Sequence, residues 1–521
     1  MTSKWTVALL AATAMTTLAV TPADAQTRKR AAASGPTLAE IVAQQQRQID
    51  ALTAEISAMK AAPAAAPAVD EEAAAQTEFL KAQVDALQAQ LEGVKTATAA
   101  NTAAFKAAPE LTGQKGTPNE GFKFKVRGRF MYDTAYVENP RDAIATKDLG
   151  FSSRVRRVRL GAEGSLPGGF GYKAEFDFAD SAVGYGDVIL TWRGKRDGRD
   201  SPFELTVGNF ESLDGFEQIS SSRHISFLER SAFNEAFNNT RRLGAAATYI
   251  SRDNAFRLSV GAFNDTINAD RANDDYILAA RATYSPQLFG GQQHFGLNYQ
   301  HRSFQTNALQ NNYQARPFVR NTDTRFVSTG ALAVKTDNIY GAEYMGIWGP
   351  FHAYAEGQLL KASTLRPTDV LSGGDLSTGA RTNANPTFFG FVAEVGYFFT
   401  GETRGYKNGL LDRTKVKNPI DKGGPGAWSV NLRYDRLDLS DATGTPGATG
   451  APNFVNGGKQ TGYLASMVWQ PIDYVRVTWQ YTHGTVDGGP RVAAVVPNPN
   501  IPILDRSFNY NLAAMRVAFD F

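Results

Sequence analysis

GFKFKVRGRF, residues 121–130, alternates apolar and basic side chains. Successive side chains of a β-strand point to opposite faces, so Phe122, Phe124 and Val126 share one face and the cations share the other. The cations are Lys123, Lys125, Arg127 and Arg129. A soluble sandwich would bury the apolar face, whereas a membrane barrel would turn it to lipid and line a lumen with the cations. The rest of the chain decides between these two folds.

Similar alternating segments recur from residue 121 to the C-terminus, separated by Gly, Pro, Asn and Asp. The predicted strands are 121–137, 154–164, 170–179, 186–194, 202–210, 240–250, 255–264, 275–285, 293–304, 338–347, 351–361, 388–400, 426–440, 460–469, 473–484 and 508–521. An even number of strands allows an antiparallel barrel to close with both ends on one side. The predicted fold is therefore an all-β transmembrane β-barrel of about 16 antiparallel strands, preceded by short α-helical coiled-coil segments.

The links between these segments alternate in length. Short links such as SLPGG, SRDN, WGP and QPI alternate with long ones, and the chain ends on an aromatic strand, YNLAAMRVAFDF. Short turns at one end and long loops at the other favour an outer-membrane barrel over a propeller or a sandwich. The link 401–425 is longer than its place predicts.

The N-terminus has the pattern of an export signal. Lys4 precedes an apolar run from 5 to 20, and Ala23-Asp24-Ala25 fits a small-x-small cleavage site. Residues 1–25 are therefore predicted to be a signal peptide. The chain has no cysteine, which excludes disulfides, thiolate metal sites and a cysteine nucleophile. The net charge of +3 says little about partners, because the cations are clustered.

Between the signal and the barrel, two heptad seams occupy residues 37–95, after a lead-in at 26–36. Pro63 and Pro67 interrupt them as a hinge, and a linker at 96–120 leads to the barrel at 121–521. Two interpretations stay open. The seams form an oligomerisation stalk that contacts the cell wall, or they form a single amphipathic helix or a disordered tether. In either case this extension is expected in the periplasm.

The second predicted strand begins RVRRVRLGAEGSL and carries Arg156, Arg157 and Arg159 close together. Strict alternation cannot turn both Arg156 and Arg157 inward, so one of them lies at the strand mouth or a bulge redirects it. Arginine facing lipid at mid-membrane costs about 2–4 kcal/mol, which favours the lumen for most of these side chains. Together with the first strand they form a basic wall.

Two long loops add further cations to this wall. The loop 211–239 contributes a group of candidate constriction residues: Ser220, Ser221, Ser222, Arg223, His224 and Arg230. Folded inward, it would narrow the channel, and guanidinium and hydroxyl donors match phosphate oxygens. In the fifth loop, Arg316, Arg320 and Arg325 are expected at the mouth as an electrostatic funnel. The alternative is that these cations only neutralise lipid or neighbouring carboxylates.

Several segments resemble the phosphate- and polyphosphate-selective porin O/P family, in order and over nearly all of 121–521. They are FKFKVRGRF, VRRVRLGAEG, YKAEFDFAD, VGNFESLDGFEQISSSRHISFLER, FFTGETRGYK and AWSVNLRYDRLDL. The resemblance implies a sixteen-stranded trimeric barrel with an inward-folded third loop and a ladder of arginines. By position, Arg129 matches a pore-lining arginine, Arg156 and Arg157 match the paired constriction arginines, and Arg316 and Arg320 match mouth arginines. There are two departures: Gln218 stands where a phosphate-binding lysine is expected, and Arg159 stands in place of a pore aromatic.

The sequence therefore predicts a bacterial outer-membrane channel for small anions such as phosphate, pyrophosphate or polyphosphate. We expect a homotrimer in outer-membrane lipid, with no cofactor, no metal and no nucleic-acid partner. One alternative is a general porin in which the basic wall faces acids such as Glu175 and Asp177 across the lumen. A remote alternative is a barrel hydrolase using His224, His301 or His483 as base, but the chain has only 5 histidines and neither a GxSxG nor an HExxH motif. We therefore predict that the protein is not an enzyme.

Overall fold

This computed structural model describes residues 121–521 except 146–147, 197–198, 269–274, 305–308, 370–378 and 443–453, and scattered positions between 54 and 92. Within the barrel region the main sheet has seventeen strands, of which β11 (Gln287–Leu288) only extends the edge of β12. The other sixteen are β1 (Lys123–Val137), β2 (Gly150–Leu166), β3 (Phe170–Asp177), β4 (Gly184–Trp192), β7 (Phe203–Phe210), β8 (Arg242–Ile250), β9 (Phe256–Phe263), β10 (Tyr276–Tyr284), β12 (Gly291–Ser303), β15 (Val334–Trp348), β16 (Phe351–Thr364), β17 (Thr387–Phe398), β20 (Ala427–Ala442), β21 (Phe454–Ile472), β22 (Val475–Asp487) and β23 (Ser507–Asp520).

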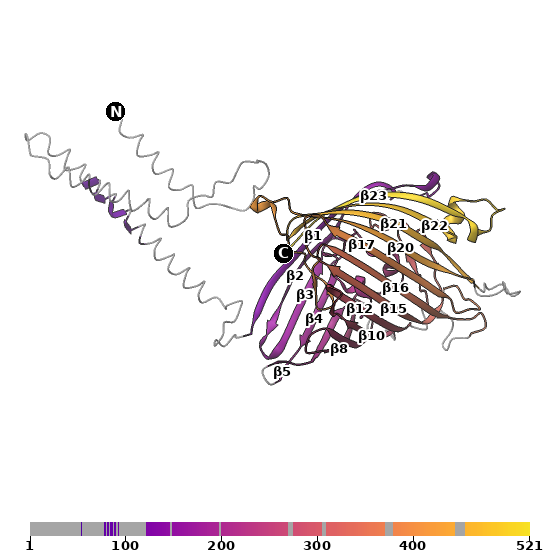
Figure 1. Ribbon diagram of the computed structural model, residues 1–521, viewed down its shortest axis with the longest axis horizontal. Helices are drawn as coiled ribbons and strands as arrows, with labels where there is room; N and C mark the ends of the chain where they lie inside the picture. The colour runs from indigo at the N-terminus through magenta and orange to yellow at the C-terminus, as the bar shows by residue number, and fades with distance from the viewer. Residues whose placement is uncertain are drawn as a thin grey trace, which may run out of the picture. The chain divides into compact units, whose positions relative to one another are not determined.

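The sheet closes on itself as an antiparallel barrel. Each of the sixteen strands pairs with its neighbour in the chain, and β1 pairs with both β2 and β23 (Figure 1). The backbone N–H of Gly128 donates to the carbonyl of Phe521 at 3.1 Å, which joins the first strand to the last residue. Each strand predicted from the sequence coincides with one of these sixteen, so the predicted barrel is confirmed.

Alternation along each strand separates an apolar outside from a polar inside. On β20, Leu432 is 54% exposed on the outer wall, whereas its neighbour Arg433 is 4% exposed inside. Rings gather on the outer wall at the short-turn end, where Trp428 stacks on Trp469 with centroids 5.6 Å apart. An apolar outer wall with aromatic borders and a polar interior is the pattern of a barrel in lipid.

Three connections fold into the lumen. Loop 3 (residues 211–241) carries the short helices α4 (Phe216–Ile219) and α5 (Ala232–Ala236). Loop 5 (residues 304–333) carries the strand pair β13 (Gln314–Ala315) and β14 (Val327–Ser328). At the short-turn end, the insert at 399–426 carries the pair β18 (Tyr406–Lys407) and β19 (Leu410–Leu411). Buried aromatic residues of loop 3 and loop 5 pack with wall residues in one apolar cluster, which holds these two loops in place.

The smaller elements lie in the remaining connections. They are β5 (Lys195–Arg196), β6 (Arg199–Asp200), α6 (Gly489–Val495) and the 3-10 turns η1 (Pro140–Asp142), η2 (Pro167–Gly169), η3 (Ile420–Lys422) and η4 (Ile503–Asp505). In the part of the chain that the structure describes, no helix is both long and apolar enough to cross a membrane. The predicted signal peptide, lead-in and linker lie outside the described residues, and so does nearly all of the predicted coiled coil.

Candidate functional site

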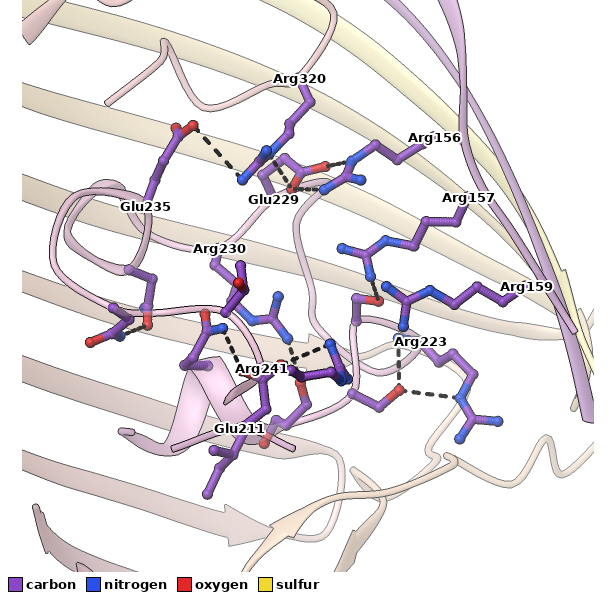
Figure 2. A pocket seen from close by; sticks show the side chains of 18 of the residues that line it. Arg156, Arg157, Arg159, Glu211, Arg223, Glu229, Arg230, Glu235, Arg241 and Arg320 are labelled. Atoms are coloured by element: carbon purple, nitrogen blue, oxygen red, sulfur yellow. Dashed lines mark hydrogen bonds and ion pairs between the residues drawn. The ribbon is translucent and has the colours of Figure 1, made fainter. Parts of the chain in front are cut away.

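A β-bulge in β2 resolves the conflict between its adjacent arginines. Met131 of β1 lies opposite Arg157, but the next residue, Tyr132, lies opposite Val155, so Arg156 is an extra residue. A bulge of this kind redirects a side chain that strict alternation would turn outward. Arg156 and Arg157 therefore both line the same lumen cavity, and they project into it side by side in Figure 2.

Loop 3 forms the opposite side of this cavity and is held by carboxylates of the far wall. The backbone N–H of Phe216 donates to Glu343 at 2.8 Å, and that of Glu217 donates to Glu356 at 3.0 Å. At the start of α5, the N–H of Ala232 lies 3.3 Å from both oxygens of Asp435. Hydrogen bonds to otherwise unpaired N–H groups fix the loop in the lumen. The inward fold of this loop is thus present in the structure.

The centre of the cavity is a pair of arginines that share one serine. Arg129 donates from Nη1 to the hydroxyl of Ser222 at 2.8 Å, and Arg157 donates to the same oxygen at 3.0 Å. Arg129 also reaches the hydroxyl of Ser221 at 3.4 Å. Both arginines are buried, and the Nε–H of each has no hydrogen-bond acceptor in the described chain. Buried donors without acceptors are costly, and an incoming oxyanion would satisfy them.

Cations outnumber carboxylates around this cavity, whose volume is about 390 Å³. The cations are Arg127, Arg129, Arg156, Arg157, Arg159, Lys173, Arg223, Arg230, Arg241, Arg316 and Arg320, and the carboxylates are Glu175, Asp187, Glu211, Glu229 and Glu235. Eleven positive charges against five negative ones leave an excess of six. Of these cations, Arg157 and Arg230 make no ion pair among the described residues. Arg157 bonds to the hydroxyl of Ser222, whereas Arg230 bonds to two backbone carbonyls.

The other arginines of the basic wall are partly neutralised. Arg159 binds Glu175 at 2.6 Å and Asp177 at 2.8 Å. These two acids stand on the neighbouring strand β3, beside the basic wall. The expectation that they face it across the lumen is therefore corrected. Arg127 bonds to Glu163 and lies 3.5 Å from Glu175.

A carboxylate of loop 3 stays ionised at the upper part of the cavity. Glu229 accepts two hydrogen bonds from Arg156, at 2.7 and 3.1 Å, and one from Arg516 at 2.9 Å. Burial alone would raise the pKa of Glu229, but Arg156 and Arg516 outweigh burial and hold that pKa well below its usual range. Figure 2 shows Glu229 between Arg156 and Arg320.

Loop 5 contributes two of its arginines to the lining of the same cavity. Arg316, only 8% exposed, donates to Asp323 at 2.7 Å and also pairs with Glu235. Arg320 lies 3.9 Å from Glu229 and 3.8 Å from Glu235. Both line the cavity, because loop 5 folds inward beside loop 3. Arg320 also lies beside the start of β2, where its carbonyl accepts a hydrogen bond from Arg154 at 3.0 Å, so the place of these residues at the mouth stays a prediction.

The remaining candidates take other places. Lys123 and Lys125 are exposed at the short-turn end of β1 and do not belong to the cavity lining. Arg230 donates to the carbonyls of Glu217 at 2.7 Å and Ser220 at 2.8 Å, so it braces loop 3. Arg223 lies below the serines, where it donates to Asp520 at 3.2 Å.

His224 is a neutral residue of the constriction. Burial, together with Arg223 and other nearby arginines, lowers the pKa of His224 to about 2. The other two histidines considered as bases, His301 and His483, each bond to an asparagine on the adjacent strand, at 3.0 Å. The described part of the chain thus does not bring these three histidines together as a hydrolytic site.

The insert at 399–426 also belongs to this region, which was not predicted from the sequence. Arg404 donates to the carbonyl of His224, and the N–H of Leu411 donates to the hydroxyl of Ser220 at 3.3 Å. The insert therefore supports the serine turn of loop 3 from the short-turn end. Its only signal in the sequence was a link longer than its place predicts.

A closed lipid-facing barrel with polar loops packed inside and a charged constriction is the structure of an outer-membrane channel. The sequence pattern of the family "Phosphate-selective porin O and P" matches residues 124–501. The chain therefore belongs to the phosphate-selective porin O and P family.

Three comparisons illustrate the similarity. An uncharacterized protein of Caulobacter vibrioides is 34% identical over 99% of this chain and 95% of its own length. Porin O of Pseudomonas aeruginosa is 25% identical over 71% of this chain and 85% of its own length. The outer membrane channel DcaP of Acinetobacter baumannii is 13% identical, with a TM-score of 0.44 over 77% of this chain and 97% of that chain.

Proposed function

We propose that this outer-membrane channel is selective for small anions, with phosphate, pyrophosphate or polyphosphate as its preferred solutes. The observation that carries the proposal is the pair Arg129 and Arg157. Their guanidinium groups converge on Ser222, and each keeps an Nε–H without an acceptor in the described chain. A tetrahedral oxyanion offers several oxygens at once, which suits such converging donors.

Passage of an anion through the channel depends on partial neutralisation of the pore cations by carboxylates. An anion entering from the long-loop end first meets Arg316 and Arg320, whose charges Glu235 offsets in part. It then exchanges part of its hydration for Arg156, Arg157 and Arg129. Because neighbouring carboxylates weaken most of these cations, binding is favourable enough for entry and weak enough for release.

The alternative is a general porin in which the basic wall and facing acids only set a transverse field. Glu211, Glu229 and Glu235 of loop 3 do line the cavity and supply such acids. The excess of cations favours anion selectivity over this alternative.

Planar-bilayer recording tests the proposal. In a potassium chloride gradient, the reversal potential should have the sign of anion selectivity, and added phosphate should block the chloride current. A cation-selective reversal potential would reject the proposal. Selectivity for chloride without phosphate block would favour the general porin.

The family resemblance extends the proposal to the assembly. We propose a homotrimer in outer-membrane lipid, with the N-terminal extension in the periplasm and in contact with the cell wall. Deletion of residues 37–95 tests the role of the extension. It should leave the barrel folded and reduce attachment of the outer membrane to the cell wall, measured by co-sedimentation with peptidoglycan.

A further inference from the structure

The serine turn of loop 3, residues 220–224, is held by two different sets of arginines. In the cavity, the hydroxyl of Ser222 accepts hydrogen bonds from Arg129 and Arg157. The carbonyls of the last two residues of the turn accept hydrogen bonds from arginines that do not line the cavity. Each peptide unit carries a dipole, so the direction of these carbonyls decides whether they repel an anion in the cavity.

The two arginines of the second set come from separate elements. Arg476 of β22 donates to the carbonyl of Arg223 at 3.0 Å, and Arg404 of the insert donates to the carbonyl of His224. Neither Arg404 nor Arg476 belongs to the residues that line the cavity of about 390 Å³. A solute in that cavity therefore contacts the turn but not these two side chains.

The charges of Arg404 and Arg476 are not offset by an ion pair among the described residues. The two carboxylates that act on them from further away are bonded elsewhere: Glu394 lies 2.9 Å from Arg433, and Asp520 pairs with two other arginines. Within the described residues, the turn carbonyls are the only hydrogen-bond acceptors of both side chains. A cation enclosed without a carboxylate partner is costly, and the bonds to the turn offset part of that cost.

We propose that Arg404 and Arg476 are positioning residues of the anion site in loop 3. A hydrogen bond from a charged donor is about twice as strong as one between neutral groups, so two of them on adjacent residues fix the turn firmly. They direct two carbonyl oxygens to arginines outside the cavity and keep the hydroxyl of Ser222 between Arg129 and Arg157. Donors that are fixed in advance bind a solute without a further ordering cost. This inference rests on the proposed anion selectivity.

A spin label on the turn tests the positioning role in the absence of any solute. The chain has no cysteine, so Ser221→Cys provides a single labelling site in the purified full-length protein. In this background, Arg404→Gln and Arg476→Gln should each give a more mobile nitroxide spectrum, because one carbonyl of the turn loses its donor. Arg413→Gln is the matched control, since Arg413 is a cation of the same insert that pairs with Asp520. It should not raise the mobility of the label.

Phosphate block of the chloride current in planar bilayers measures the consequence for the site. Arg404→Gln should weaken block about tenfold, the change expected from one lost hydrogen bond to a charged group. Arg413→Gln removes the same charge and should weaken block by less than about twofold. A double-mutant cycle with Ser222→Ala separates positioning from charge. If Arg404 acts through the turn, its substitution should change block by less than about twofold in the Ser222→Ala background.

Heat-modifiable gel mobility checks that each variant has folded. Unchanged label mobility in both Arg404→Gln and Arg476→Gln would overturn the inference. Effects of Arg404→Gln and Ser222→Ala that multiply would also overturn it, and would leave Arg404 as a remote charge. A wild-type channel that phosphate does not block would refute the proposed function instead, and the mobility of the label would still decide the positioning role.

Discussion

The two sides of loop 3 use charge in opposite ways. Toward β12–β20, carboxylates such as Glu343 and Asp435 accept hydrogen bonds from backbone N–H groups of Phe216 and Ala232. Toward β1–β3, guanidinium groups such as that of Arg157 keep donors without acceptors. The first side holds the loop through these bonds, although buried atoms there such as Arg433 Nε also lack partners. The second side places its free guanidinium donors among the residues that line the cavity. We call the first the anchoring side and the second the cationic side.

The difference teaches where in this lumen a solute can bind. A charge that is already satisfied by the chain stabilises the loop, and a solute gains little by competing for it. A buried donor without an acceptor in the chain forms a hydrogen bond only when a solute arrives, and this bond favours binding of the solute. Variants of each side should therefore produce different phenotypes.

The largest effect is expected from removing two arginines of the cationic side. Arg129→Gln combined with Arg157→Gln should weaken phosphate block by at least about 100-fold, since each hydrogen bond to a charged group contributes roughly 1.5–3 kcal/mol. Block of chloride current in planar bilayers measures it. Lys123→Gln combined with Lys125→Gln is the matched control on the same strand and should change block little. Equal block in both double variants would place the anion elsewhere.

A smaller effect is expected from loosening the anchoring side. Asp435→Ala leaves the N–H of Ala232 without its acceptor, which costs about 1–3 kcal/mol. Loop 3 should then fluctuate, so we expect noisier single-channel currents and roughly tenfold weaker phosphate block. Asp438→Ala alters the outward face of the same strand and should leave the current traces unchanged. Quiet currents from Asp435→Ala would show that loop 3 does not need this anchor.

A somewhat smaller effect is expected at Glu229, the carboxylate of loop 3 that binds Arg156. Glu229→Gln removes the charge that offsets Arg156, so phosphate should block about five- to tenfold more strongly. Asp180→Asn, which removes an exposed partner of Arg154, is the control and should have little effect. Weaker block in Glu229→Gln would mean that this carboxylate orients Arg156 more than it neutralises it.

The smallest effect is expected from His224, whose charge state does not vary with pH in the physiological range. The pKa of His224 is lowered to about 2 and that of Glu229 lies well below its usual range, so neither group changes charge between pH 8 and pH 5. Asp214 of the same loop does change charge in this interval, because burial raises its pKa to about 7. Any pH step in the chloride reversal potential should therefore survive the substitution His224→Gln. A step near pH 6.5 that His224→Gln abolishes would contradict this and show that His224 ionises.

Much of the barrel was predictable because its strands follow a local rule. Alternation of side chains placed Arg127 and Arg129 on the lumen face before any tertiary information was used. The same rule cannot hold at both Arg156 and Arg157, and the sequence left a bulge as one of two explanations. The pairing of β1 with β2 shows that the bulge is present, because a bulge depends on two strands. The anchoring carboxylates were also missed. Glu343 belongs to no motif in the sequence, and only packing brings it against loop 3.

The amino-acid sequence by itself determined a lipid-facing barrel with a cationic interior, because alternation and turn length are properties of neighbouring residues. Only the tertiary structure decided that Ser222 joins Arg129 and Arg157, and that the loop 5 arginines reach the cavity. These contacts link residues far apart in the chain. Their geometry depends on how three inward-folded connections pack against one another, which no local pattern encodes.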